Sequence, residues 1–211
     1  MKTIGILKLS IGLALSFVMG AMLISCDDDK DIERVIWVDD DEYEGLPAYT
    51  EWGYNTFGAY VNNRTFASAR YFSEAPMHFY SGNDTLTFCM EAHQYSTYSP
   101  IISTLKFVFP YKHITKYTGL KELQGVVVDL AADDVKVRVL TSVNDYSEEV
   151  TLNVESGELK FSRVQILYID GDMVEAIVSG TFQFDATTEG TSLEVRHGRF
   201  DVGVDGDNLS F

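Results

Sequence analysis

The sequence is poor in cysteine, in proline and in basic side chains, and each shortage narrows the possibilities. It contains two cysteines and four prolines, against 12 tyrosines and 13 phenylalanines. Chains so rich in aromatic residues and so poor in proline form a folded core and are not disordered. Basic side chains number 16 against 32 acidic ones, for a formal net charge of -16. This charge disfavours binding to nucleic acid or to anionic lipid, whose phosphates need basic neutralisation.

Familiar catalytic and metal-binding motifs are also missing from the sequence. The four histidines form no His-x-x-x-His pair, and there is no Cys-x-x-Cys pair, so we expect no zinc site. Neither a Gly-x-Ser-x-Gly motif nor a glycine-rich phosphate loop occurs. Paired acids such as Asp133-Asp134 and Glu148-Glu149 lie at expected strand ends, where solvated charge is the usual role. We therefore expect no catalytic residue, no enzymatic activity and no cofactor.

Oxygen ligands gather near the C-terminus, at Asp201, Asp205, Asp207 and Asn208. Their spacing does not follow the Asp-x-Asp-x-Asp-Gly pattern of calcium loops. Asp205 followed by Gly206 is more typical of a hairpin turn or a fraying end, and we expect no metal here.

One long hydrophobic run is present, from Leu9 to Ile24, and Lys2 and Lys8 precede it. At about 16 residues it is shorter than the roughly 20 that a permanent membrane-spanning helix needs. A cleaved export signal is therefore favoured over a retained anchor. We predict that residues 1–25 are a signal peptide.

The run ends in Leu23-Ile24-Ser25-Cys26, which resembles the lipobox of bacterial lipoproteins. In that family the cysteine thiol receives a diacylglyceryl group, the leader is cut before the cysteine, and the new amine is acylated. The resemblance implies lipidation of Cys26. Several acyl chains, at about 0.8 kcal/mol per buried CH₂, would hold the chain on the membrane almost permanently.

The next four residues, Asp27, Asp28, Asp29 and Lys30, resemble the acidic export tag of Bacteroidetes-type surface lipoproteins. The resemblance implies a lipid anchor in the outer membrane, with the protein at the cell surface. A solvated linker in a protein that faces the periplasm would have the same acidic composition, so this alternative stays open.

Lipidation of Cys26 would leave Cys89 alone, so no intramolecular disulfide could form. Within Thr85–Glu91, Cys89 is expected to pack as a small apolar group and not to act as a nucleophile. The leader contains two of the 16 basic residues and no acidic one, so 14 basic and 32 acidic residues remain. The net charge of the mature part is then near -18.

We expect residues 26–47 to form an acidic tether and residues 48–211 to form one all-β domain. A domain of about this size buries roughly 70% of its extended surface. Within the tether, Val35–Val38 is apolar. It is either an early strand at the sheet edge or a part of the tether, and we favour the tether.

Short alternating strands separated by Gly, Asn and Asp follow each other through this domain. Phe57–Val61 and Arg64–Ala69 predict a hairpin with Asn62-Asn63 as its turn, because Asn tolerates the left-handed conformation that such turns need.

A second hairpin is predicted around Gly82-Asn83. This turn would place Met77 opposite Phe88 and Phe79 opposite Leu86, all on one face. Apolar residues would then meet apolar residues across the strands.

The remaining pattern predicts further strands and one short helical turn at Leu120–Leu123. About a dozen short strands indicate an all-β fold, as an antiparallel β-sandwich or, alternatively, a closed or partly open β-barrel. The predicted strands cover residues 103–110, 126–130, 135–141, 149–155, a strand opening at Gly157, 164–169, 173–184, and two final strands around Leu193–Val195 and Phe200–Val204.

Two segments near the C-terminus, Gly180-Thr-Phe-Gln-Phe184 and Gly198-Arg-Phe-Asp-Val202, resemble the closing signature of uncharacterised lipoprotein families of gut-type Bacteroidetes. Gly58-Ala-Tyr-Val-Asn62, within the aromatic region that begins at Tyr54, resembles their opening strand. The resemblance implies a small all-β domain in the mature protein. It carries over no catalytic residue, because none is established for those families.

Exposed aromatic side chains are the best candidates for ligand binding, because sugar rings stack on aromatic faces and Tyr and Trp dominate recognition surfaces. Trp52, Tyr54, Tyr95 and Tyr98 are the candidates for stacking on a ligand. The alternative is that these side chains pack in the core or cover its open end.

These observations favour a non-enzymatic binding module of the cell envelope, with a glycan or another envelope protein as partner. The alternative is a structural or pilin-like assembly component, which would need an exchangeable terminal strand; Val35–Val38 is the candidate. A hydrolase would require two carboxylates that face each other across a cleft, and the sequence does not select such a pair.

Overall fold

The structure is a computed structural model that describes residues 35–70, 76–95, 100–143, 146–169, 172–205 and 209–210. The predicted signal peptide, Cys26 and the acidic tag lie outside these residues. Among the residues described, no helix has the length and apolar character needed to cross a membrane.

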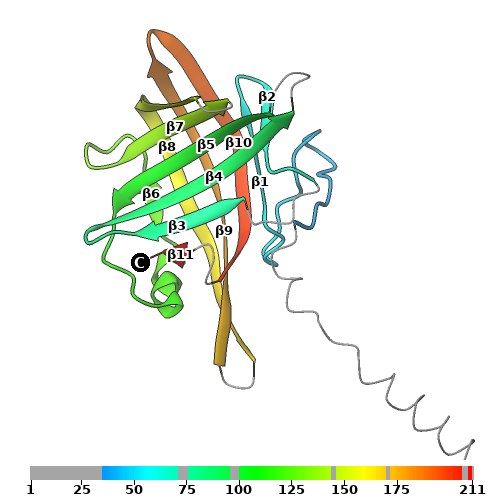
Figure 1. Ribbon diagram of the computed structural model, residues 1–211, viewed down its shortest axis with the longest axis vertical. Helices are drawn as coiled ribbons and strands as arrows, with labels where there is room; N and C mark the ends of the chain where they lie inside the picture. Colours follow the sequence, from blue (N-terminus) through cyan, green and yellow to red (C-terminus); the bar gives the residue numbers. More distant parts are fainter. Residues whose placement is uncertain are drawn as a thin grey trace, which may run out of the picture. The chain divides into compact units, whose positions relative to one another are not determined.

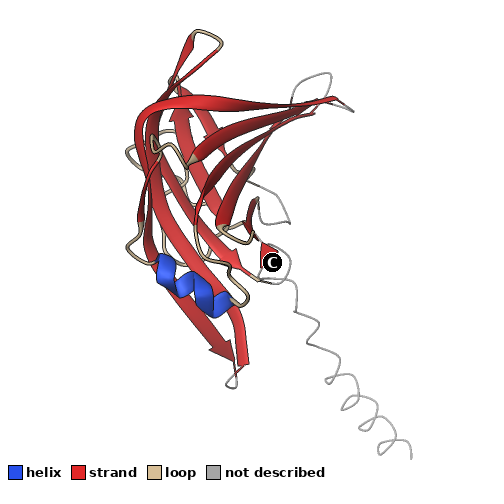
Figure 2. Ribbon diagram, turned by 90° about the vertical axis from the view of Figure 1, so that its left-hand side faces the viewer, coloured by secondary structure: helices blue, strands red, loops and turns tan. Residues whose placement is uncertain are grey.

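Eleven strands form one sheet that is mostly antiparallel and curls into a half-barrel (Figures 1 and 2). The expected all-β antiparallel fold is confirmed, in the form of a partly open barrel. The strand order is β11-β3-β4-β5-β7-β8-β9-β10-β1-β2, with β6 paired to β8 outside this path. The strands are β1 Thr56–Val61, β2 Arg64–Ala67, β3 Met77–Ser81, β4 Thr85–Tyr95, β5 Pro100–Pro110, β6 Val127–Asp129, β7 Lys136–Val143, β8 Tyr146–Ile169, β9 Asp172–Thr188, β10 Thr191–Val204 and β11 Leu209–Ser210.

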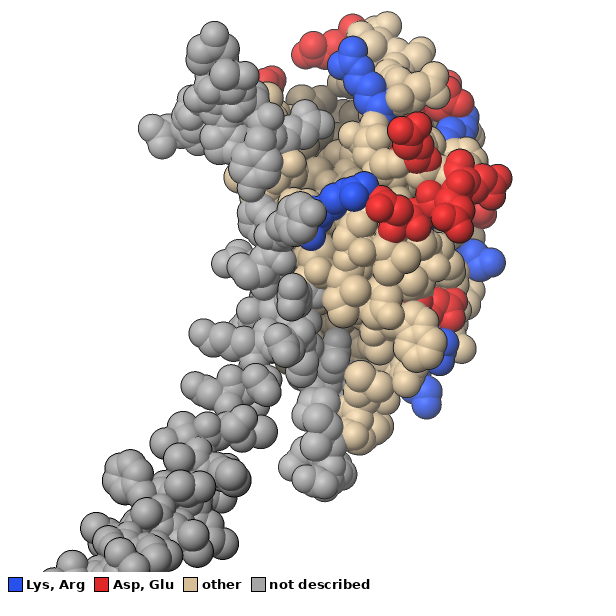
Figure 3. Space-filling model, turned by 90° about the vertical axis from the view of Figure 1, so that its right-hand side faces the viewer, with Lys and Arg blue, Asp and Glu red and all other residues tan. Residues whose placement is uncertain are grey.

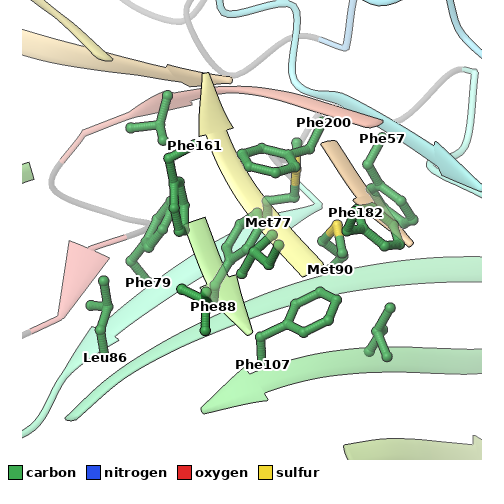
Figure 4. Packing of buried hydrophobic residues seen from close by; sticks show 14 of the residues in the cluster. Phe57, Met77, Phe79, Leu86, Phe88, Met90, Phe107, Phe161, Phe182 and Phe200 are labelled. Atoms are coloured by element: carbon green, nitrogen blue, oxygen red, sulfur yellow. The ribbon is translucent and has the colours of Figure 1, made fainter. Parts of the chain in front are cut away.

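The curl brings the inner faces of the two halves of the sheet together, and phenylalanine fills the space between them (Figure 4). Phe88 on β4 lies 4.8 Å from Phe200 on β10, and Phe107 on β5 lies 5.5 Å from Phe182 on β9, between ring centroids. Each ring buries a large apolar surface, which makes this cluster the main source of stability. The fully buried phenylalanines in the described residues are Phe57, Phe79, Phe88, Phe107, Phe109, Phe161, Phe182, Phe184 and Phe200.

A short 3-10 helix, η2 (Tyr117–Leu123), packs beside β8 and β9 (Figure 2). Its Leu120 and Leu123 are completely buried in the core. The helical turn expected at these leucines is confirmed, and it begins earlier than predicted.

The first predicted hairpin is confirmed in turn and register. Val61 pairs with Arg64, and Asn62 and Asn63 form the turn with φ of 48° and 62°. Both values lie in the left-handed region, which Asn adopts at lower cost than most residues.

The second predicted hairpin forms, but its predicted register is wrong by two residues. Phe79 pairs with Phe88, not with Leu86, because Asn83 and Asp84 form the turn in place of Gly82 and Asn83. A shift of two residues returns each side chain to the same face. The predicted inward face is therefore correct although every predicted pair is wrong.

Two further expectations were wrong because they divided one long strand into shorter ones. Three predicted strands, at 149–155, from Gly157 and at 164–169, form the single strand β8, and the last two predicted strands form the single strand β10. The ladder of β8 with β9 shifts register at Val154–Ser156, Phe161–Arg163 and Leu167–Tyr168, and the ladder of β10 with β9 shifts at Val195–Gly198. A bulge bends and twists a strand without ending it, so an interrupted pattern did not mean two strands.

The two C-terminal segments singled out in the sequence lie side by side, in β9 and β10. The glycine of each segment lies opposite a phenylalanine of the other: Gly180 pairs with Phe200, and Gly198 pairs with Phe182. A Cβ on Gly180 would lie 2.0 Å from the Lys160 carbonyl oxygen and 2.6 Å from the Phe200 ring. The glycines are therefore required for the opposing rings to reach the core.

Residues 35–47 do not extend as the predicted tether, and Val35–Val38 does not join the sheet edge. Val35 is 5% exposed and Leu46 is completely buried. The Ile36 amide donates to the Tyr54 carbonyl at 2.8 Å, so this segment pairs with the residues that lead into β1. An acidic composition predicted a solvated linker, but the apolar residues between the acids hold the segment on the domain.

Candidate functional site

A loop at residues 50–54 is fixed to β10 by one buried carboxylate. Asp201, 1% exposed, accepts hydrogen bonds from the backbone amides of Trp52, Gly53 and Tyr54 at 2.9–3.1 Å. The Thr50 hydroxyl donates to the same carboxylate at 2.5 Å. Hydrogen bonds to a charged acceptor are stronger than neutral ones. Asp201, considered above as an oxygen ligand, thus uses its oxygens to hold the loop.

The segment just before this loop is held over the outer face of β1. A Cβ on Gly58 would lie 2.6 Å from the Pro47 ring, so the segment can lie this close only because position 58 has no side chain. The Tyr60 hydroxyl donates to the Glu44 carbonyl at 2.8 Å. Residues 40–49 therefore form a fixed wall on this face of the domain.

An ion pair connects this wall to β10. Arg199, 9% exposed, donates to Asp40 Oδ2 at 2.5 Å, and its guanidinium lies 4.8 Å from the centre of the Tyr43 ring. Asp40 Oδ1 also accepts from the amides of Glu42 and Tyr43. Burial by itself would raise the pKa of Asp40, but these amides and the Arg199 charge outweigh it and lower that pKa. The carboxylate stays ionised at neutral pH.

A hollow of about 430 Å³ lies between this wall and the sheet. Tyr43 and His197 form one side, with ring centroids 4.2 Å apart, and Tyr49 contributes a third ring. The Tyr49 hydroxyl donates to Glu51 at 3.1 Å, and burial raises its pKa, so it remains a neutral donor. Further lining comes from Asp40, Glu158, Thr181, Phe182, Gln183, Gly198 and Arg199.

A second hollow, of about 480 Å³, continues along the same face. The two share Glu158 and Gln183, which are paired across β8 and β9 and point outward. We call the continuous depression the outer groove. The second hollow is lined by Ser156, Gly157, Glu158, Gln183, Phe184, Asp185 and Arg196.

Two glycines allow β9 to approach its neighbours closely beside the outer groove. A Cβ on Gly157 would lie 2.3 Å from the Phe184 Cβ, and one on Gly198 would lie 2.2 Å from the Phe182 carbonyl. Gly157 has a φ of 149°, and His197 beside Gly198 has a φ of 54°. The bulges beside these glycines and the missing side chains together hollow out this part of the sheet.

Both arginines that line the outer groove are paired with carboxylates, and Glu158 adds an unpaired negative charge. Arg199 is paired with Asp40, and Arg196 is paired with Asp185 at 2.6 Å and with Glu194 at 3.0 Å. Figure 3 shows acidic side chains gathered on the face where residues 35–55 lie, with basic side chains beside them. No other described side chain forms a hydrogen bond or ion pair with the Glu158 carboxylate or the Gln183 amide.

Of the four predicted stacking residues, the structure describes the side chains of Trp52 and Tyr54. Trp52 is 72% exposed on the loop that Asp201 holds, and Tyr54 is half-buried beside it. Neither is among the residues that line the outer groove. Tyr95 ends β4 and its side chain is not described, while Tyr98 lies outside the described residues.

Sequence reasoning did not single out four groove residues as site residues: Tyr43, Glu158, Gln183 and His197. They come from four segments of the chain, and of the four only Gln183 belongs to a segment noted in the sequence, Gly180–Phe184. The available signal was a glycine inside a strand pattern, at positions 157 and 198, because such a glycine marks a bulge or a close approach.

Cys89 is buried in β4, and burial raises the pKa of its thiol to about 11. This agrees with a packed apolar group and not with a nucleophile. Within the described ranges, no three His, Cys, Asp or Glu side chains lie close enough together to hold a metal ion.

Comparisons with family models, with curated proteins and with solved structures found no match to this chain.

Proposed function

We propose that this protein is a non-enzymatic binding module that holds a neutral glycan in the outer groove. The observation that carries the proposal is the cross-strand pair of Glu158 and Gln183, which lies where the two hollows meet. A carboxylate accepts hydrogen bonds and a carboxamide both donates and accepts them, as adjacent sugar hydroxyls require. The rings of Tyr43 and Tyr49 supply apolar surface for a sugar face at one end.

The charge of the groove supports a neutral ligand. Both arginines are already paired with carboxylates, so neither is left to bind a sulfate or a uronate. The protein as a whole has a net charge of -16, which repels anions.

The fixed backbone also supports binding. The wall at residues 40–49 is held by the ion pair between Asp40 and Arg199 and by the contact of Pro47 with Gly58. A site that is formed before binding avoids the cost of ordering its side chains.

A binding role is favoured over hydrolysis because of how the carboxylates are used. Asp40 and Asp185 are each bound to an arginine, which leaves Glu158 as the one unpaired carboxylate among the groove residues described. Glycoside hydrolysis generally needs two available carboxyl groups, one acid and one base or nucleophile.

Binding can be tested with a glycan array and calorimetry on the full chain. We expect Gln183→Ala and Tyr49→Ala to weaken the binding of any array hit by about fivefold to thirtyfold, the effect of losing one or two polar or stacking contacts. Trp52→Ala is the matched control, since Trp52 is an exposed aromatic residue outside the groove. Equal losses in all three variants, or no hit on the array, would contradict the proposal; capture of an envelope protein instead would support the other partner class.

For location, we propose that lipid on Cys26 holds the protein in the outer membrane with the β domain at the cell surface. The support is the Leu-Ile-Ser-Cys sequence and the acidic residues that follow it. Protease treatment of intact cells should release the domain, and Cys26→Ala should abolish the membrane attachment. Protection until the outer membrane is lysed would place the domain in the periplasm.

A further inference from the structure

A third hollow differs from the outer groove in place and in chemistry. It has a volume of about 230 Å³ and is lined by residues of β1, β2, β5, β7, β9 and β10, which lie on both sides of the half-barrel. We call it the mouth cavity. Most of its surface comes from the apolar side chains Val61, Phe66, Leu105, Val139, Leu193 and Val195.

Several of these side chains are only partly buried although they pack against the core. Val61, Phe66, Val139 and Leu193 are in this group, whereas Leu105 and Phe184 deeper inside are at most 5% exposed. Covering such half-buried apolar surface is favourable by about 25 cal/mol per Å². The mouth cavity therefore has apolar surface that remains partly exposed to water and that an apolar ligand would cover.

One basic side chain lies at this cavity. Arg64, at the start of β2, is exposed and lines it together with Thr65 and Ser103. The five other described arginines each form an ion pair with Asp or Glu, but no described carboxylate lies within ion-pair distance of Arg64. In a protein with 32 acidic side chains, an unpaired arginine at an apolar cavity is a specific anion-binding feature.

We propose that the mouth cavity binds a small aliphatic monocarboxylate, of the medium-chain fatty acid type. The carboxylate pairs with Arg64, the Ser103 and Thr65 hydroxyls lie beside it, and the aliphatic chain covers the valine and leucine side chains above Phe184. At about 230 Å³ the cavity is smaller than the roughly 300–1,000 Å³ of sites for drug-sized ligands. The size favours a short or medium chain over a long one. This site is distinct from the outer groove and has only the buried Phe184 in common with its lining.

The first test uses decanoate and decanol with the full chain carrying Cys26→Ala, in buffer without detergent. Methyl-labelled NMR spectra should show saturable shifts for Val61, Leu105, Val139, Leu193 and Val195, and no shift for the fully buried Leu159. Decanoate should bind about fivefold more tightly than decanol, the upper end of what an exposed ion pair contributes. Absence of saturable shifts with decanoate, or shifts outside the cavity alone, would overturn the proposal.

The second test separates the charge from the cavity. Arg64→Gln should weaken decanoate binding about fivefold, to the level of decanol, and should leave decanol binding unchanged; Arg64→Lys should restore part of the difference. Arg163→Gln is the matched control, an exposed arginine that is paired with Glu51 away from the cavity. If Arg64→Gln and Arg163→Gln lower decanoate affinity equally, the effect is one of net charge and the assignment to Arg64 is wrong.

A third variant fills the cavity. Val139→Phe adds bulk at a half-buried position on β7 and should abolish the binding of both ligands while the protein still unfolds cooperatively. Unchanged decanoate affinity in a folded Val139→Phe protein would place the ligand elsewhere. The result does not depend on the glycan array, because neither outcome there alters this cavity.

Discussion

The two halves of the curled sheet differ in regularity, and the difference coincides with the position of the outer groove. The ladders that join β3, β4, β5, β7 and the start of β8 run residue for residue without a shift. The ladders of β8 with β9, β9 with β10 and β10 with β1 each contain a bulge. We call these the regular half and the bulged half (Figure 1). The outer groove lies on the bulged half.

The regular half shows what an uninterrupted ladder produces on its outer face. There, Glu149 of β8 accepts hydrogen bonds from Lys106 and Arg138 at 2.8 Å, so neighbouring strands cover the surface with paired side chains. In the bulged half, glycines and extra residues break this cover and leave a depression. Irregular strand pairing is thus the origin of the groove. We expect matched substitutions in the two halves to differ in their cost to the free energy of unfolding.

The largest effect is expected from adding one methyl group. Gly180→Ala would place a Cβ 2.0 Å from a backbone oxygen of β8 and against the Phe200 ring, which should cost about 3 kcal/mol of unfolding free energy or more. Gly82→Ala in the regular half would meet chiefly the Thr85 hydroxyl, which can rotate away, and should cost less than about 1 kcal/mol. Urea unfolding measures both. Similar costs for the two variants would show that close strand approach is not special to the bulged half.

The next effect concerns the side chains that hold loops. Asp201→Asn removes the charge that three backbone amides and Thr50 share and should cost about 2–4 kcal/mol. In the regular half, Ser81 has the comparable task, since its hydroxyl oxygen accepts from the Ile114 amide at 2.7 Å. Ser81→Ala should cost only about 1 kcal/mol, because the bonds lost, from the Ile114 amide and with His113 Nδ1 at 3.3 Å, involve no carboxylate. Hydrogen exchange should show faster exchange at Gly53 and Tyr54 in Asp201→Asn, and an unchanged rate there would contradict the assigned role.

A smaller effect, dependent on pH, is expected from the ion pairs. The pKa of Asp40 is lowered, as is that of Glu149, where hydrogen bonds from Lys106 and Arg138 are the main cause. A lowered pKa in the folded state stabilises the protein above the ordinary value, 3.8 for Asp40, and this stability is lost as the pH falls through the folded value.

Asp40→Asn should therefore cost about 1–2 kcal/mol at pH 7, and the difference from wild type should shrink below pH 4. Glu149→Gln should cost less, about 0.5 kcal/mol, because its carboxylate is more exposed than that of Asp40. Unfolding free energies measured between pH 3 and pH 7 check both. A cost for Asp40→Asn that does not vary with pH would show that the charge is not what matters.

The last test changes no residue and measures how well the outer face of the regular half protects Cys89 from reaction. With a thiol pKa raised from 9.0 to about 11, Cys89 should react with a thiol reagent at pH 8 about a hundredfold more slowly than an ordinary cysteine. The rate should become normal in urea. A fast reaction in the folded protein would mean that the outer face of the regular half opens readily.

Sequence reasoning reached the parts of the fold that depend on neighbouring residues. The turn at Asn62-Asn63 was predictable because the left-handed conformation is a local property of Asn. The strand predicted at 103–110 is confirmed within β5, and its alternate residues Leu105, Phe107 and Phe109 are buried, as the two-residue period of a strand requires.

The register of the second hairpin was not predictable in the same way. Gly82-Asn83 and Asn83-Asp84 both have suitable turn chemistry, and both place the same residues inward. The turn that forms places Phe79 opposite Phe88, and their rings stack with centroids 4.5 Å apart. Turn propensity alone does not distinguish this register from the predicted one.

The outer groove could not be predicted from the sequence. Glu158 and Gln183 are next to the buried Leu159 and Phe182 and therefore point outward, but their adjacency depends on the register of a ladder that bulges shift. The wall at residues 40–49 was not predicted, because its acidic composition is typical of a solvated linker. Leu46 is buried only against a surface that the folded sheet provides.

The pairing of β1 with β10 has a consequence for the time course of folding. Phe57 pairs with Phe200, and the loop at residues 50–54 depends on Asp201. The N-terminal part of the domain therefore needs β10, near the C-terminus, for its contacts. Contacts between residues so far apart in the chain form slowly, because a long loop must close first. During synthesis, β1 can pair only with β2 until residues 191–204 have emerged. The ion pair that connects the wall to the sheet and the β10 side of the mouth cavity therefore form only after β10 has emerged, and a chain shortened before β10 would lack both.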